Sequence, residues 1–207
     1  MSKSIQSTAY TIEWVFNPFV LPTLILSTAY YYDPIVVFPF TSFIIYFIGI
    51  VTLLFPAALT LLIRKWKHIT KNTARYQSML FTGLIIFYSL LFFFLMHKFK
   101  SSYFLYTLLI DIPIVLIIYV IIKAIMANLY APSLIWGGTL GFWLALSYER
   151  TDATFLYPTI QCIIVSGLLL SIYLYLHRSS PRSIYIAYTC GFVLNFLFLT
   201  LPRMVFF

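Results

Sequence analysis

Long apolar runs separated by short polar links make up most of the chain. A helix needs about 20 predominantly apolar residues to cross the hydrocarbon core of a bilayer. By that measure the sequence contains seven candidate spans, which cover residues 14–32, 35–63, 77–96, 103–126, 130–147, 155–176 and 184–206. The runs are continuous and do not alternate with polar residues, so they predict helices and not the strands of a membrane barrel. We therefore expect an all-α, polytopic transmembrane bundle.

Prolines interrupt the first two runs. Residues 14–32 contain Asn17, Pro18 and Pro22, so an alternative interpretation of this run is a re-entrant or interfacial segment, which leaves six spans. Residues 35–63 are longer than one span needs and also contain prolines, so we expect a tilted or kinked helix. No link is long enough for a soluble domain. The expectation is one integral membrane domain over residues 1–207, with six to seven spans.

The composition agrees with this class. Hydrophobic residues make up 62% of the chain and charged residues 9%, whereas about 25% of a soluble domain is charged. The mean hydropathy is +0.98. So few charges cannot cover the surface of a soluble protein of this size, and a disordered chain needs low hydrophobicity. We expect a multi-pass protein of the bacterial inner membrane.

The charges are unevenly distributed. Thirteen Lys and Arg stand against five Asp and Glu, a net charge of +8. With seven spans, nine basic residues share one membrane face: Lys3, Arg64, Lys65, Lys67, Lys71, Arg75, Lys123, Arg178 and Arg182. The opposite face holds four: Lys98, Lys100, Arg150 and Arg203. Basic residues in short loops mark the cytoplasmic side, which favours the first face as cytoplasmic. Retention of these cations to bind anionic headgroups would produce the same bias.

Asp111 is the acid that lies well inside an apolar run, in the segment LLIDIPIVL. A carboxyl group inside a membrane is costly and is a functional candidate by default. Pro113 follows two residues later and loosens the helix, because proline cannot donate to the carbonyl one turn earlier. Two interpretations stay open: a proton or ion site or polar hinge, and a protonated side chain hydrogen-bonded to a neighbouring helix.

Glycines lie close together in the segment PSLIWGGTLG. Gly137 and Gly141 have the spacing that lets two membrane helices approach closely. Pro132 and Ser133 suit the start of a helix. Helix packing is therefore one interpretation of this segment, and a helix N-terminus that offers N–H groups to a phosphate is the other.

The densest basic stretch is RKWKHITKNTAR, residues 64–75. One interpretation is a solvated loop that touches anionic lipid. The sharper one is a clamp for a lipid headgroup or pyrophosphate. Its candidate residues, all on one face with seven spans, are Lys67, Lys71, Arg75, Arg178 and Arg182, with Ser133 as a further candidate.

The sequence predicts no metal and no cofactor. The three histidines, His68, His97 and His177, lie at the edges of apolar runs and have no ligand spacing on a helix. Nucleotide-binding glycine patterns and a GxSxG nucleophile elbow are absent from the sequence. The expected partners are therefore membrane lipids and other membrane subunits, and not nucleic acid.

Four segments in order resemble one known family. They are VFNPFVLPTL, KNTARYQ, APSLIWGGTLG and YLHRSSPRSIYIAYTCGF. Together they resemble small bacterial membrane proteins of the type 2 phosphatidic acid phosphatase superfamily. The resemblance implies a helical membrane scaffold that binds lipid phosphates or pyrophosphates. In active members, a nucleophilic histidine, a second histidine and basic residues carry out the hydrolysis.

The family's catalytic motifs are degenerate here. Arg75 has no proline after it, and Pro132–Ser133 is followed by leucine and isoleucine where the family has Gly-His. Alignment on Pro181 puts Tyr173 at the family's arginine, Ser179 at its histidine and Ser183 at its acid. The resemblance therefore implies a phosphatase-like pseudoenzyme: a protein that binds lipid headgroups, or an accessory subunit of a membrane complex.

Two alternatives remain. His177 lies two residues from the family's histidine position, so a working lipid phosphate phosphatase with a displaced histidine is the second hypothesis. A small transporter is the third, and it would need a polar path across the membrane. The side chains that the sequence offers for that path are Asp111, Asn128, Gln161 and Asn195.

Overall fold

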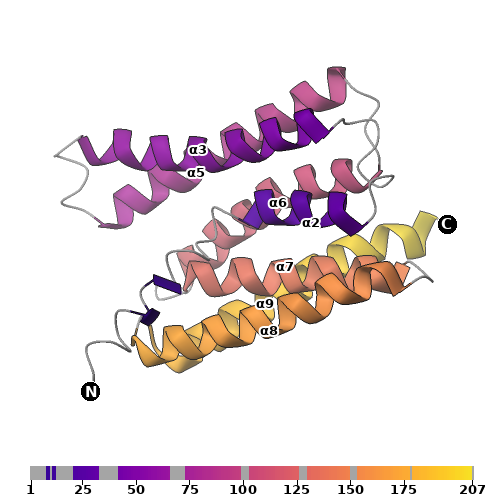
Figure 1. Cartoon of the computed structure of the whole chain (residues 1–207). Helices are drawn as coiled ribbons and strands as arrows, with labels where there is room; N and C mark the ends of the chain where they lie inside the picture. The colour runs from indigo at the N-terminus through magenta and orange to yellow at the C-terminus, as the bar shows by residue number, and fades with distance from the viewer. Residues whose placement is uncertain are drawn as a thin grey trace. The chain divides into compact units, whose positions relative to one another are not determined.

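The computed structural model is helical throughout the part of the chain that it describes (Figure 1). The described residues are 8–9, 11–12, 21–32, 42–65, 73–98, 103–125, 130–149, 153–177 and 179–206. The helices are α2 (Leu21–Tyr32), α3 (Ser42–Lys65), α5 (Thr73–Lys98), α6 (Tyr103–Ile125), α7 (Ala131–Glu149), α8 (Leu156–Tyr175) and α9 (Pro181–Phe206). A 3₁₀ turn, η3 (Ala153–Phe155), precedes α8. The prediction of an all-α protein is confirmed for these residues.

The helices follow the apolar runs, with one marked difference at the first. The first predicted span was 14–32, but α2 has 12 residues. At 1.5 Å per residue it is about 18 Å long, well short of the roughly 30 Å hydrocarbon core. The remainder of that predicted span, residues 14–20, lies outside the described residues. The second helix, α3, begins at Ser42 and has 24 residues, so it is shorter than its run.

Within the described residues, two helices are long and apolar enough to cross a membrane: Leu156–Tyr175 and Pro181–Thr200. Met79–Leu95 of α5 is a shorter apolar stretch. Two is fewer than the seven predicted spans. In α7 the physical reason is composition, because its glycines, hydroxyl residues and tryptophans lower the hydropathy of a helix whose one charged residue, Glu149, stands at its end.

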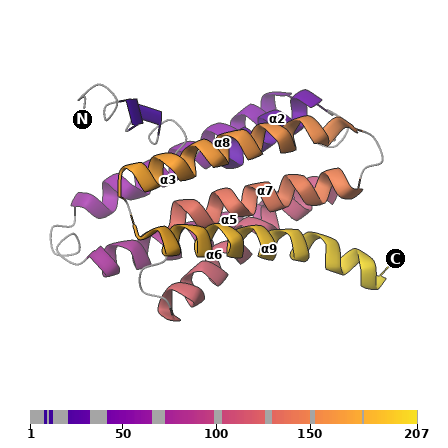
Figure 2. The same cartoon turned by 90° about the horizontal axis from the view of Figure 1, so that it is seen from below.

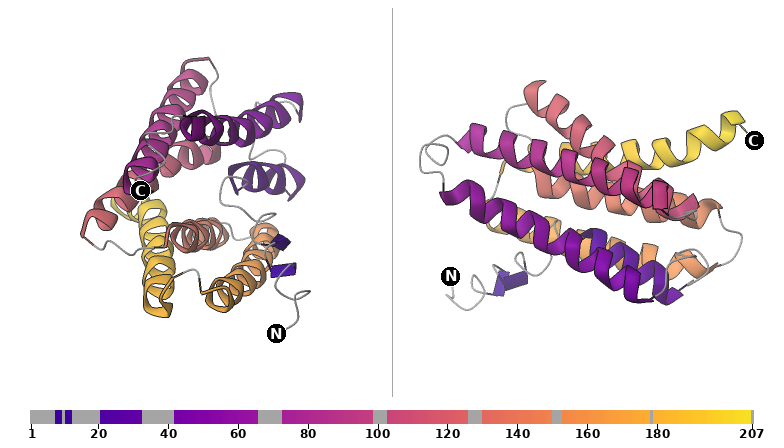
Figure 3. Two further views of the ribbon diagram at one scale, coloured as in Figure 1. Left: turned by 90° about the vertical axis from the view of Figure 1, so that its left-hand side faces the viewer. Right: turned by 90° about the horizontal axis from the view of Figure 1, so that it is seen from above.

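The chain forms two compact units. The first, which we call the α7–α9 unit, comprises Met1–Leu21 and Ile122–Phe207. The second, the α2–α6 unit, comprises Pro22–Ile121. In the α7–α9 unit, α7 contacts both α8 and α9 and lies between them (Figure 2 and Figure 3).

The core of the α7–α9 unit forms around α7, which lies between the other two helices. Leu134, Phe142 and Ala145 of α7 are almost completely buried. The neighbour α8 buries a single stripe at helical spacing, which contains Thr159, Cys162, Ser166, Leu169 and Tyr173. Its other face exposes large apolar side chains. Thus α7 is covered by protein on both sides, while α8 has one face for the protein and another for its surroundings.

In the α2–α6 unit, α3 and α5 lie side by side (Figure 1). The rings of Phe55 and Phe87 stack with centroids 3.8 Å apart. Thr23 Oγ1 of α2 donates to the Gly49 carbonyl of α3 at 2.9 Å, and Thr52 Oγ1, within α3 itself, donates to the same oxygen at 2.9 Å. Hydroxyl groups satisfied in this way can be buried between helices at little cost.

Candidate functional site

The contact between α7 and α9 is made by backbone. A Cβ on Gly137 would meet the carbonyl oxygen of Tyr188, and a Cβ on Gly141 would meet that of Phe192. The contact is reciprocal, because a Cβ on Gly191 of α9 would meet the carbonyl oxygen of Leu134 in α7. The absence of side chains at these positions therefore sets the separation of the two helices.

Ser133 belongs to this same contact. Its side chain is fully buried, and its hydroxyl donates to the carbonyl oxygen of Ile184 at 2.7 Å. The proton that would serve a phosphate is thus already used in a hydrogen bond between α7 and α9. The structure gives Ser133 a helix-packing contact in the place where the sequence suggested a ligand contact.

Hydroxyl groups also join α8 to its neighbours. Thr159 Oγ1 lies 3.2 Å from the Trp143 carbonyl oxygen of α7 and 2.8 Å from that of Phe155. Ser166 Oγ and the Tyr188 hydroxyl of α9 are 2.9 Å apart. Each of the three helices therefore has a polar link to the other two, in addition to apolar packing.

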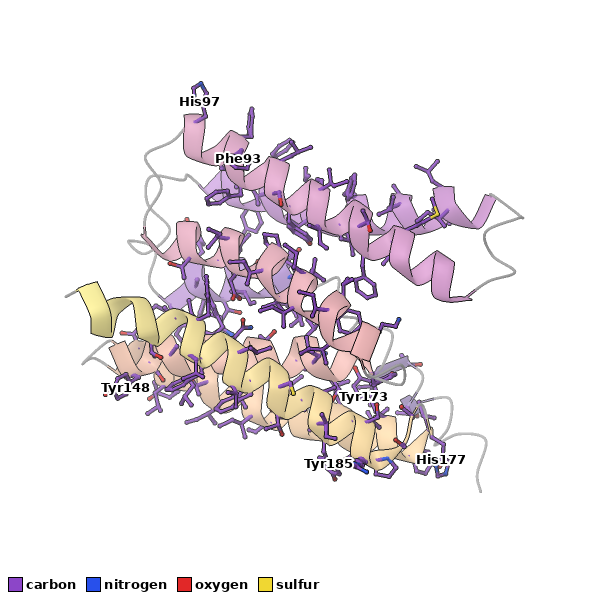
Figure 4. All side chains as sticks on the ribbon, turned by 180° about the vertical axis from the view of Figure 1, so that it is seen from behind. Phe93, His97, Tyr148, Tyr173, His177 and Tyr185 are labelled. Carbon is purple, nitrogen blue, oxygen red and sulfur yellow. The ribbon has the colours of Figure 1, made fainter. Side chains whose placement is uncertain are left out.

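One end of the α7–α9 unit gathers two helix N-termini. The Ser133–Ile184 bond places the starts of α7 and α9 together, and the rings of Tyr130 and Tyr173 meet at 5.0 Å where α8 ends. In Figure 4, Tyr173, His177 and Tyr185 lie at this end and Tyr148 lies at the other. We call it the Arg182 end, after the exposed arginine in the first turn of α9.

The backbone at the Arg182 end is sharply turned. His177 follows α8 with φ of 49°, the left-handed region that usually takes glycine after a helix. Its side chain is exposed. Ser180 then caps α9, because its hydroxyl accepts the Ser183 N–H at 3.3 Å and its carbonyl accepts the Ile184 N–H at 3.1 Å. Two helix N-termini and an exposed arginine lie here against the single C-terminus of α8, so the balance of charge at this end is positive and favours negatively charged groups.

The predicted headgroup clamp is only partly described. Arg182 is exposed at the start of α9. Lys67, Lys71 and Arg178 lie outside the described residues, and Arg75 lies in α5 without a described side chain. Arg75 belongs to the α2–α6 unit and Arg182 to the α7–α9 unit. The clamp stays a prediction.

Asp111 lies inside α6 and is 5% exposed. Its Oδ1 atom is buried and has no hydrogen-bond partner. The same helix face buries Thr107 one turn earlier, and Val115 and Tyr119 one and two turns later. Pro113 lies within the helix, as the sequence indicated.

The side chains of the proposed polar path have different surroundings. Asn195 is 4% exposed and its amide nitrogen occupies the space above Gly138, while its Oδ1 is buried without a partner. Gln161 is exposed on α8, and Asn128 lies outside the described residues. The roles of Gly191 and Asn195 in the helix contact were not foreseen, although a single glycine inside the apolar run of residues 184–206 was an available signal.

Within the described residues, no group of three or more His, Cys, Asp or Glu side chains could hold a metal ion. No protein-family model, no curated protein and no solved structure matches this chain.

Proposed function

We propose that the chain is a multi-pass protein of the inner membrane, with six to seven spans, that binds anionic lipid headgroups without hydrolysing them. The observation that carries the proposal is the match between bilayer thickness and the uncharged stretches of α8 and α9. The uncharged helix α8 has 20 residues, about 30 Å along its axis. Arg182 and Arg203 bracket an uncharged stretch of α9 that is about 31 Å long by the same rise.

The exposed surface of α8 supports a membrane location. Between its ends, α8 exposes Ile160, Ile163, Ile164 and Leu168. A soluble protein rarely leaves so continuous an apolar stripe in water, whereas lipid chains cover such a stripe without cost. Exposed tyrosines lie near the ends of the helices of this unit: Tyr148, Tyr157 and Tyr185. Tyrosine is typical of the interface between lipid and water.

The headgroup part of the proposal rests on the Arg182 end. A lipid phosphate at this level would meet the exposed Arg182 guanidinium and the positive ends of two helix dipoles. Arg203 is a matched counterpart on the same helix, at the C-terminal end where the dipole is negative. The two side chains are therefore chemically identical, but the α9 dipole is positive beside Arg182 and negative beside Arg203.

We propose that the protein does not hydrolyse lipid phosphates, because it lacks a suitable pair of histidines. Family-type phosphoryl transfer needs one histidine as nucleophile and a second as acid. Residues 122–207 contain a single histidine, His177, and the Ser133 hydroxyl is held by Ile184. The proposal also includes the phosphatase-like scaffold and the role of an accessory subunit. A headgroup-binding bundle with short links would contact its partner proteins inside the bilayer.

The test compares lipids and arginines. Purified protein is titrated with phosphatidic acid and with phosphatidylcholine, and retained lipid is counted by native mass spectrometry. We expect phosphatidic acid to be retained preferentially, Arg182→Gln to weaken that retention about tenfold, the worth of one charge-assisted hydrogen bond, and Arg203→Gln to leave it nearly unchanged. Equal retention of the two lipids, or equal effects of the two substitutions, contradicts headgroup binding at the Arg182 end.

A second assay addresses hydrolysis. The protein is incubated with phosphatidic acid and with undecaprenyl pyrophosphate, and released phosphate is measured. We expect no release above that of buffer. Turnover that His177→Ala abolishes would instead establish a lipid phosphatase with a displaced histidine. A pull-down in mild detergent, analysed by mass spectrometry, tests for a stable membrane complex.

A further inference from the structure

The carboxyl group of Asp111 in α6 is buried without a full set of hydrogen bonds. It lies eight residues after the first residue of the helix, about 12 Å along its axis, and it is 5% exposed. Buried polar atoms in proteins nearly always have a hydrogen-bond partner, so each exception calls for an explanation. Here Oδ1 is buried and has no hydrogen-bond partner.

The side chains that the structure describes in the α2–α6 unit include no lysine or arginine, and Lys123 of α6 lies twelve residues after Asp111, more than three turns away. Apart from Asp111, the ionisable side chains described in the α2–α6 unit are tyrosines of α2, α3, α5 and α6, and His97, which is exposed near the end of α5. Tyr119 shares the buried face of Asp111 two turns away and packs against Phe81 of α5. An ionised carboxylate buried without a cation would cost several kcal/mol, so the neutral acid is the form that this setting favours.

The helix around Asp111 offers further polar groups. Thr107 places a buried hydroxyl one turn before it on the same face. Pro113 has no N–H, so the carbonyl of Leu109 lacks its usual helical donor. An acid with an unmet oxygen, beside a missing helical hydrogen bond, exchanges its proton with water that reaches it more readily than an acid held in a complete network.

We infer that Asp111 is an intramembrane proton-binding site whose proton exchanges with water. The inference rests on the proposed membrane location and goes beyond headgroup binding, because it concerns a different helix and a different ligand. The class of process that it would serve is the protonation-linked movement of α6 or of a proton through the bundle.

The experiment uses the full chain in lipid vesicles and infrared spectroscopy. Wild type is expected to show the carbonyl stretch of a protonated carboxyl group that shifts in D₂O. Asp111→Asn should lose this band, and Thr107→Val, a matched change on the same face, should keep it. Wild type without the band, or with a band that does not shift in D₂O, overturns the inference.

A chemical probe tests the same carboxyl group in the wild-type protein, so its result does not depend on whether the Asp111→Asn variant folds. Dicyclohexylcarbodiimide adds to protonated carboxyl groups in apolar surroundings and leaves a stable N-acylurea, which mass spectrometry locates on the peptide. We expect modification of wild type at Asp111 and not at Glu149 or Asp152. Modification confined to the latter two contradicts the inference. Extraction of the protein from membranes by alkaline carbonate would instead refute the membrane location, so the two failures are distinguishable.

Discussion

Substitution of Gly191 by alanine tests the backbone contact between α7 and α9. The new Cβ would meet the carbonyl oxygen of Leu134 at a distance that real Cβ atoms do not show. Ordinary C···O contacts are about 3.3–3.6 Å, so the helices would have to separate by on the order of 1 Å to restore that distance. The backbone of α9 fixes the position of the Cβ and the oxygen belongs to the backbone of α7, so no side-chain rotation can relieve the clash.

The expected magnitude follows from known costs of overpacking. Added methyl groups in packed cores cost about 1–3 kcal/mol, and the backbone clash puts Gly191→Ala towards the upper limit. Gly167→Ala is the matched control, because Gly167 lies on the exposed face of α8 and its Cβ would meet nothing within 4 Å. Replacing a helical glycine there should be neutral or stabilise by up to about 1 kcal/mol.

The assay is unfolding of purified protein in mixed micelles by sodium dodecyl sulfate, followed by far-ultraviolet circular dichroism. The free energy of unfolding should fall for Gly191→Ala and not for Gly167→Ala. Gly137→Ala should resemble Gly191→Ala, and the double variant should lose less than the two losses combined, because helices that have already separated accept a second methyl group cheaply. Equal stability of Gly191→Ala and Gly167→Ala would refute the reasoning.

Two further predictions concern single polar groups in the same unit. The pair formed by Ser166 and the Tyr188 hydroxyl should give a coupling energy of about 0.6 kcal/mol, and at most about 1.7, in a double-mutant cycle of Ser166→Ala and Tyr188→Phe; a coupling of zero would show that the hydroxyls do not interact. His177→Gly should raise the unfolding free energy by about 1 kcal/mol, because glycine adopts the positive φ of this residue without steric cost. His177→Ala keeps the strain and should not stabilise, so equal gains from the two variants would count against the conformational explanation.

The positions of the helices could be predicted from the sequence because apolar run length is a local property. The runs 77–96, 103–126 and 155–176 correspond closely to α5, α6 and α8. The run 14–32 did not, since α2 is only 12 residues long. Proline chemistry had already marked that run as open to a second interpretation.

The roles of the candidate site residues were less predictable, because each role depends on contacts with residues that are distant in the sequence. The spacing of Gly137 and Gly141 was compatible with packing or with phosphate binding, and only the position of α9 shows backbone carbonyls facing both glycines. The role of the Ser133 hydroxyl is likewise not decided by the sequence, because the carbonyl oxygen to which it donates belongs to Ile184, 51 residues later.

The sequence by itself determined the class of structure: apolar runs of about 20 residues favour helices, because a helix satisfies the backbone hydrogen bonds within each run. Only the tertiary structure decided which polar groups are occupied and which are not. Ser133 and Ser166 have partners, whereas Oδ1 of Asp111 and Oδ1 of Asn195 do not. The physical reason is that a buried polar atom is satisfied by whatever the fold brings within about 3 Å, and that distance is a property of helix packing and not of spacing along the chain.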